Sequence, residues 1–160
     1  YQTCSGWLRG ANECFAYKGF QIIKITLPTN KEFFIVNTHM DAGRRDSDRS
    51  SRKRQLEHIV STISQKTSTQ ALIVAGDLNL HSKNPDDVKL LKKFKKELKL
   101  TDAFIGNKIS EKWTILDYIL YRQSKEVEFE IISVGEDKSF INEEGPLSDH
   151  PALFIEVSIE

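Results

Sequence analysis

The sequence has few cysteines and no long apolar run. Two cysteines, Cys4 and Cys14, cannot form the disulfide framework of a small secreted domain, and one bridge and two free thiols are equally compatible with them. No uninterrupted apolar stretch approaches the roughly 20 residues that a membrane-spanning helix needs, so no transmembrane segment is expected. Proline-rich linkers and internal repeats are also missing, and no glycine-rich loop follows a predicted strand, so a Rossmann nucleotide site has no support.

The sequence also lacks an excess of charge of either sign. It contains 23 Lys and Arg against 23 Asp and Glu, which argues against a protein that wraps nucleic acid with a wholly basic surface. Local imbalance remains. The stretch Arg44–Arg54 holds six basic residues against two acids, whereas Glu126–Glu144 holds seven acids against one lysine. The basic stretch follows a predicted buried strand, so we expect part of it to contact phosphate.

What the sequence does contain is an alternation of strand-like and helix-like segments. Apolar residues at helical spacing predict two helices that pack on a core, around Leu56–Ile63 and Val88–Leu98. Apolar runs predict the strands Phe20–Leu27, Phe33–Val36, Ala71–Ala75, Ile115–Tyr121, Val127–Val134 and Ala152–Ile159. The expected fold class is therefore α/β, with a mixed or antiparallel sheet and flanking helices in one unit, 1–160.

Polar clusters stand at the ends of these apolar runs. They are Asn37–Asp41, Gly76–Asn79 and Ser148–Pro151, and a fourth acid, Asp117, interrupts an apolar run. A carboxylate in such a run needs a charged, metal or hydrogen-bonding partner. Together the clusters offer carboxylates, an amide and two imidazoles, a set that suits Mg²⁺ better than zinc.

Four motifs carry a resemblance to a known family. In order along the chain they are NTHMDAG (37–43), AGDLNL (75–80), LDYIL (116–120) and SDHPAL (148–153). This series resembles the endonuclease/exonuclease/phosphatase superfamily. The segment Asn12–Phe20 is further similar to one in bacterial neutral sphingomyelinases. The resemblance implies the C-terminal portion of a four-layer, deoxyribonuclease-like α/β sandwich.

The resemblance also implies roles for individual residues. Asp77 is similar to the acid that orients or deprotonates the attacking water, and Asn79 to the amide that holds the phosphate or the water. His150 resembles the general-base or phosphate-stabilising imidazole, oriented by Asp117. His39 resembles the histidine that contacts the phosphate or protonates the leaving oxygen.

The remaining assignments concern the metal and the substrate. Asp149 resembles an acid of the metal site, and Asn37, Arg44 and Arg45 are expected to contact the substrate phosphate. The implied cofactor is Mg²⁺, with Mn²⁺ as a possible substitute. The substrate would be a phosphate ester, either in nucleic acid or in a phospholipid head group, and no protein partner is indicated.

The family pattern is not complete in this chain. The early Asn and the metal-binding Glu that the family's first half supplies have no counterpart before Phe20, so we expect a partial domain and weak activity in isolation. Sphingomyelinases that act on membranes carry an exposed hairpin with aromatic residues, whereas Phe140 is the one aromatic residue in 133–147. This argues against insertion into lipid and weakens the sphingomyelinase assignment. Alternatives to a nuclease-like phosphodiesterase are a sphingomyelinase-like phospholipase C and a non-catalytic binding module of the same fold.

Overall fold

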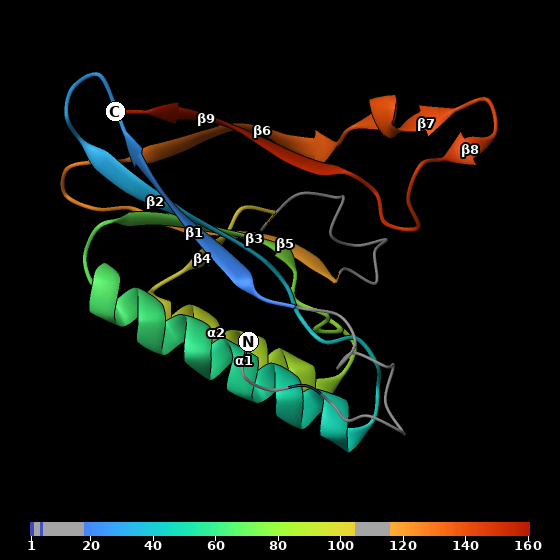
Figure 1. Ribbon diagram of the computed structural model, residues 1–160. Helices are drawn as coiled ribbons and strands as arrows, with labels where there is room; N and C mark the ends of the chain where they lie inside the picture. Colours follow the sequence, from blue (N-terminus) through green and yellow to red (C-terminus); the bar gives the residue numbers. More distant parts are fainter. Residues whose placement is uncertain (2–3, 5–17, 105–115) are drawn as a thin grey trace.

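The computed structural model describes residues 1, 4, 18–104 and 116–160 and shows a mixed α/β arrangement. A central sheet has the strand order β1-β2-β3-β5-β4 (Figure 1). Its strands are β1 (Phe20–Thr26), β2 (Glu32–His39), β3 (Ala71–Asp77), β4 (Thr101–Asp102) and β5 (Asp117–Arg122). Strands β2 and β3 are parallel and the other neighbouring pairs are antiparallel, so the predicted mixed sheet is confirmed.

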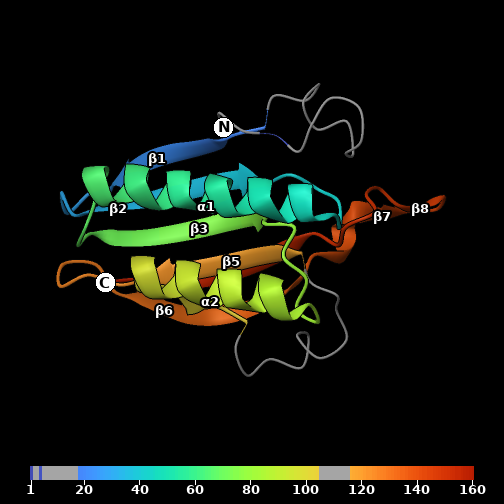
Figure 2. The ribbon, with the colours of Figure 1, turned by 90° about the horizontal axis from the view of Figure 1, so that it is seen from below.

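Two helices cover one face of this sheet. They are α1 (Asp46–Lys66) and α2 (Pro85–Leu98), which lie side by side and begin at the same end of the molecule (Figure 2). The predicted apolar stripe of α1 is confirmed, because Leu56, Ile59 and Ile63 are all buried against the sheet core. The Asn84 side chain caps the start of α2, and Lys99 ends it in the left-handed conformation. Neither described helix is long and apolar enough to span a membrane.

A small second sheet lies against part of the other face. It pairs β6 (Phe129–Glu136) with β9 (Leu153–Ile159) in antiparallel register, with an irregularity between Ile131 and Ser133. Phe129 packs edge-to-face on Phe33 at a ring separation of 5.5 Å, within a second apolar cluster. The second sheet covers the central sheet near the starts of β2 and β3. Elsewhere on the same face, Ile23 and Asn37 are exposed.

A hairpin projects beyond the second sheet. After the short 3₁₀ turn Lys138–Phe140 it consists of β7 (Ile141–Asn142) and β8 (Gly145–Pro146) and extends away from the body of the protein (Figure 1). Phe140, Ile141 and Leu147 are large apolar residues exposed here. The prediction from aromatic residues alone did not identify this exposed apolar patch, because two of its three members are aliphatic.

The strand predictions are otherwise confirmed to within three residues at each end. Ile115, the predicted start of one strand, lies outside the described residues, as do Cys14 and 12–17 of the sphingomyelinase-like segment. Cys4 is disulfide-bonded.

Candidate active site

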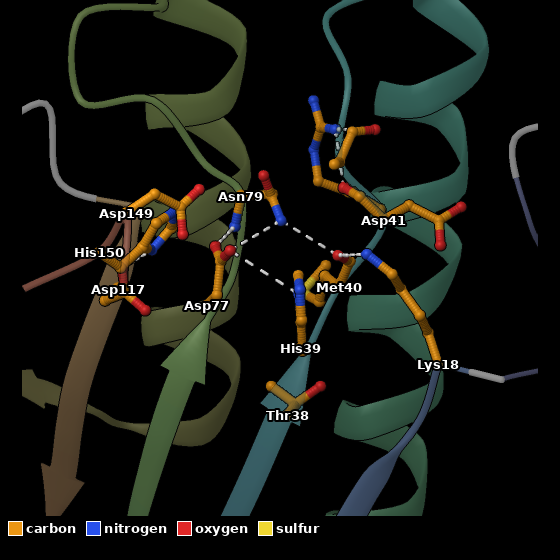
Figure 3. Close-up of polar contacts among 12 residues, drawn as sticks. Lys18, Thr38, His39, Met40, Asp41, Asp77, Asn79, Asp117, Asp149 and His150 are labelled. Carbon is orange, nitrogen blue, oxygen red and sulfur yellow. Dashed lines mark hydrogen bonds and ion pairs between the residues drawn. The ribbon is translucent and has the colours of Figure 1, made fainter. Parts of the chain in front are cut away.

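The ends of three neighbouring strands bring the polar clusters together. His39, the last residue of β2, is the register partner of Asp77, the last residue of β3. Asp77 is in turn the partner of Asp117, the first residue of β5. Register partners of adjacent strands point to the same face of a sheet, so the three side chains stand in one row at this edge (Figure 3).

Gly76 allows β2 and β3 to meet closely at this point. Its φ of 131° favours glycine, and a Cβ there would collide with the carbonyl oxygen of Thr38. The glycine in the sequence AGD therefore lets the strand approach its neighbour just before the catalytic candidate Asp77.

His150 approaches this row from the loop before β9. Its Nδ1 lies 2.6 Å from Asp117 Oδ2, so Asp117 fixes the ring and leaves Nε2 without a hydrogen-bond partner among the described residues. Burial lowers the pKa of His150, but the hydrogen bond and charge of Asp117, helped by the charges of Asp77 and Asp149, outweigh burial and raise the pKa above its ordinary value. The predicted pairing of Asp117 with His150 is present in the structure.

Asp77 occupies the centre of the row and is mostly buried. Its Oδ1 accepts a hydrogen bond of 2.7 Å from the backbone N–H of Asn79. Burial raises the pKa of Asp77 above its ordinary value; the hydrogen bond from Asn79 opposes this shift, and the negative charge of Asp117 adds to it. A carboxylate with a raised pKa is a better proton and hydrogen-bond acceptor than an ordinary one.

Asn79 connects the loop after β3 to the loop after β2. The residue has a positive φ of 51°, and its Nδ2 donates to Asp77 Oδ2 and to the Met40 carbonyl, each at 3.1 Å. Lys18 Nζ donates to the same carbonyl at 3.0 Å, a contact that the sequence did not predict. Both donors of the Asn79 amide group are thus oriented by the protein.

His39 is held far less tightly than His150. Its Nδ1 is 3.7 Å from Asp77 Oδ2, too long for a hydrogen bond, and its side chain is 61% exposed against 34% for His150. Asn37 is two residues earlier on the same strand and is also exposed, so alternation along β2 puts both on one face.

Asp77, Asp117 and His150 form a group that could hold a divalent cation. One ligand atom from each lies within 4.8 Å of the others. The donor chemistry fits such an ion, because two neighbouring carboxylates repel each other and a cation between them removes that repulsion. Asp149, the predicted metal ligand, is exposed and stands beside His150 but is not part of this group within the described residues.

Asp41 is buried near the site but its carboxylate is fully engaged. It accepts hydrogen bonds of 2.7 Å from Ser51 Oγ and 2.8 Å from Gln55 Nε2. Asp41 therefore ties the loop after β2 to α1 and has little capacity left for a metal.

The two predicted phosphate ligands from the basic stretch have different surroundings. Both Arg44 and Arg45 are exposed. Arg45 is the N-cap of α1 and its backbone N–H donates to Asp48 Oδ2 at 2.8 Å, whereas Arg44 lines a pocket near the site. Neither contacts the row of His39, Asp77 and Asp117 directly in the hydrogen bonds of the described residues.

Sequence reasoning missed the buried Arg52. Its side chain is 0% exposed, and its Nη1 donates to the carbonyl groups of Asp41 and Gly43 at 3.0 and 2.9 Å. The signal was present, because Arg52 lies four residues before Leu56 and so continues the apolar stripe of α1.

A comparison with known protein families identifies the family of this chain. The family model described as "Endonuclease/Exonuclease/phosphatase family 2" matches residues 3–112, more than half of the chain. The chain belongs to this family. None of the curated protein sequences matches it.

Several solved structures share the fold of this chain. An endonuclease/exonuclease/phosphatase from Bacteroides vulgatus has a TM-score of 0.65 and 20% identity, over 88% of this chain and 55% of that one. The human Nocturnin catalytic domain with bound sulfate has a TM-score of 0.63 and 22% identity, over 89% and 53%. A Staphylococcus aureus beta toxin mutant with bound magnesium ions has a TM-score of 0.56 and 22% identity, over 81% and 51%.

The chain therefore spans about half the length of these structures. At identities below 25% the likeness shows the fold, which places this family member among deoxyribonuclease-like α/β sandwiches.

Proposed function

We propose that this chain forms part of a metal-dependent phosphoesterase that hydrolyses phosphodiester bonds by attack of water; phosphomonoesters are the closely related alternative. The observation that carries the proposal is the 2.6 Å contact between His150 and Asp117 beside the mostly buried Asp77. Two carboxylates and an oriented imidazole at one strand edge supply the acid–base groups that such a hydrolysis needs.

The oriented histidine is the proposed general base. Asp117 holds His150 through Nδ1 and stabilises its protonated form, so Nε2 can accept a proton from water. Asp77 accepts a hydrogen bond from the same water and orients it, and Asn79 acts as a positioning residue that fixes Asp77. The exposed His39, with Asn37, contacts the phosphate or protonates the leaving oxygen.

Mg²⁺ is the proposed cofactor, and Mn²⁺ a possible substitute. When bound, the ion neutralises charge on the phosphate and makes water more acidic. Of the group Asp77, Asp117 and His150, we propose that Asp77 binds the ion, because Asp117 and His150 are hydrogen-bonded to each other. Asp149 joins it as the metal-site acid that the family resemblance implies. These are few ligands for an ion that prefers six oxygen atoms, so we propose that residues beyond the 160 of this chain, among them the Glu that the family resemblance implies, complete the site.

The test is hydrolysis of a chromogenic phosphodiester with Mg²⁺ or Mn²⁺. We expect slow turnover by the 160-residue chain, faster turnover by a version extended upstream, and loss of activity in Asp77→Asn. Asp86→Asn on the exposed start of α2 is the matched control and should retain activity. Equal rates for Asp77→Asn and the unmodified protein would refute the proposal.

A second candidate is phospholipid head-group hydrolysis. It is favoured by one observation, the exposed Phe140, Ile141 and Leu147 on the projecting hairpin, because apolar side chains on such a projection can enter a lipid interface. Cosedimentation with phosphatidylcholine vesicles, before and after Leu147→Ser, separates this candidate from the first.

A further inference from the structure

A buried ion pair connects α1 to α2 beside the loops that carry the candidate active site. Arg52 belongs to α1 and Asp87 to α2, and their side chains are 0% and 2% exposed. Arg52 Nη2 lies 3.8 Å from Asp87 Oδ1, and neither atom has a hydrogen-bond partner in the part of the chain that the structure describes. Separating the two groups would leave each charge buried without its partner, which is costly, so the pair resists displacement of one helix from the other.

Arg52 binds the loop that follows β2. Its Nη1 donates hydrogen bonds to the carbonyl oxygens of Asp41 and Gly43 at 3.0 and 2.9 Å. These residues come directly after His39 and Met40, and two further side chains of α1 donate to the Asp41 carboxylate. The chain that leaves His39 is therefore fixed to α1 through both its backbone and its side chains.

Asp87 binds the loop that follows β3. Its Oδ2 accepts a hydrogen bond of 3.1 Å from the backbone N–H of His81, which lies two residues after Asn79, and its Oδ1 faces Arg52. Burial lowers the pKa of Arg52, and among the neighbouring charges Asp87 opposes this shift most. One carboxylate thus binds the second loop and stabilises the guanidinium that binds the first.

The same two loops meet again at the active site. Asn79 Nδ2 donates to the Met40 carbonyl across the two loops and to Asp77 Oδ2, each at 3.1 Å (Figure 3). A hydrogen bond of this length is lost when its atoms move apart by about 0.5 Å. The orientation of the Asn79 amide therefore depends on the separation of the loops.

We propose that Arg52 and Asp87 are positioning residues of the active site, and that their ion pair sets the separation of the loops after β2 and β3 and so the place of Asn79 beside Asp77. Its role in catalysis rests on the proposed phosphoesterase function. The pair acts on the reacting groups through the loops. Misplacement of such groups by about 1 Å can slow a reaction about 100-fold, so a small change in the separation of the loops is sufficient.

The experiment compares two buried arginines with contacts of the same kind. Arg122 is 7% exposed and donates to three backbone carbonyl oxygens. It lies at the other end of β5 from Asp117, about 17 Å away along the strand. Arg52→Lys and Arg122→Lys should therefore both lower the melting temperature, but only Arg52→Lys should disturb the active site.

The first measurement does not depend on activity. NMR follows hydrogen exchange of the Asn79 side-chain amide in the isotope-labelled chain without metal, and Asn79→Asp assigns the signal. We expect Arg52→Lys and Asp87→Asn each to accelerate this exchange at least about tenfold, because local opening of the loops becomes easier. The double variant should exceed the larger single effect only slightly, because the two residues act through each other. Arg122→Lys should leave the exchange rate unchanged.

The second measurement is steady-state kinetics of the upstream-extended protein, at a temperature where every variant is folded. We expect Arg52→Lys to lower kcat by about 10- to 100-fold. KM should change less, because the pair positions Asp77 and does not contact the substrate. Arg122→Lys should retain the kcat of the unmodified protein.

Equal acceleration of amide exchange in Arg52→Lys and Arg122→Lys would overturn the proposal, because it would indicate only a general loss of stability. Unchanged exchange in Asp87→Asn would also overturn it, and this variant decides the matter if Arg52→Lys does not fold. Faster exchange with an unchanged kcat would show that the pair binds the loops without positioning the reacting groups. Exchange that depends on the pair, without hydrolysis by any form of the protein, would refute the proposed function alone.

Discussion

The site contains two histidine–carboxylate pairs of the same residue types but of different structure. His150 lies 2.6 Å from Asp117, whereas His39 lies 3.7 Å from Asp77. The difference arises from what else each acid binds. Both oxygens of Asp77 accept hydrogen bonds from Asn79, whereas Asp117 Oδ2 receives the imidazole itself.

The two histidines suit two different tasks in the hydrolysis of a phosphate ester. An imidazole that a carboxylate holds is oriented and more basic, so it suits proton abstraction. An exposed imidazole without such a hydrogen bond is free to rotate and to contact the substrate phosphate when it binds. The four predictions below test this division, from the largest expected effect to the smallest.

The largest effect is expected from His150→Gln. Removal of the proposed base should lower turnover of a chromogenic phosphodiester by about 10²- to 10⁴-fold, measured in the form of the protein that is active. The melting temperature should change little, because the ring is partly exposed. Full activity in His150→Gln would mean that the oriented pair is structural and not the base.

Gly76→Ala should separate β2 from β3 and so disturb the row of His39 and Asp77. The new Cβ would collide with the Thr38 carbonyl at a positive φ, and we expect a loss of about 2 kcal/mol or more in the free energy of unfolding. Urea denaturation measures this. Gly19→Ala is the control, because a Cβ there meets Tyr1 N at an ordinary 3.9 Å; similar losses in both variants would contradict the argument.

Asp117→Asn should lower the pKa of His150. The hydrogen bond and charge of Asp117 raise that pKa against the opposing effect of burial, so their removal leaves burial dominant and less imidazolium near neutral pH. NMR titration of the ring in chelator-treated protein gives the pKa directly. Glu156→Gln, midway along β9, should leave it unchanged, and a pKa that does not move in Asp117→Asn would show that Asp117 does not control the pKa of His150.

Much of this arrangement was predictable from the sequence because apolar runs identify strands and the polar residues follow directly after them. Parallel β2 and β3 must end at the same edge, which brings His39 and Asp77 together. The same logic placed the stripe of Leu56, Ile59 and Ile63 on the core, and the fold class was correct.

Other features depend on contacts that no local pattern contains. The hydrogen bonds from Asn79 to Met40 and Asp77 form only when the loops after β2 and β3 lie side by side. The spacing of Arg52 from Leu56 placed it on the buried stripe of α1, but the carbonyl groups of the loop after β2 that accept its hydrogen bonds were not predictable; the sequence indicated only that part of 44–54 contacts phosphate. The roles of the site residues, with Asp149 as a metal ligand, stay predictions.

The smallest effect is expected from His39→Gln. The ring is 61% exposed and lies beyond hydrogen-bond distance of Asp77, so the free energy of unfolding should change by less than about 0.5 kcal/mol. Loss of one hydrogen bond to the charged phosphate corresponds to about 1.5 kcal/mol, which lowers kcat/KM about tenfold. Steady-state kinetics on the active form tests this, with His58→Gln on α1 as the control. A loss as large as that of His150→Gln would remove the distinction between the two pairs, because an exposed histidine without a carboxylate hydrogen bond would then be as important as the oriented one.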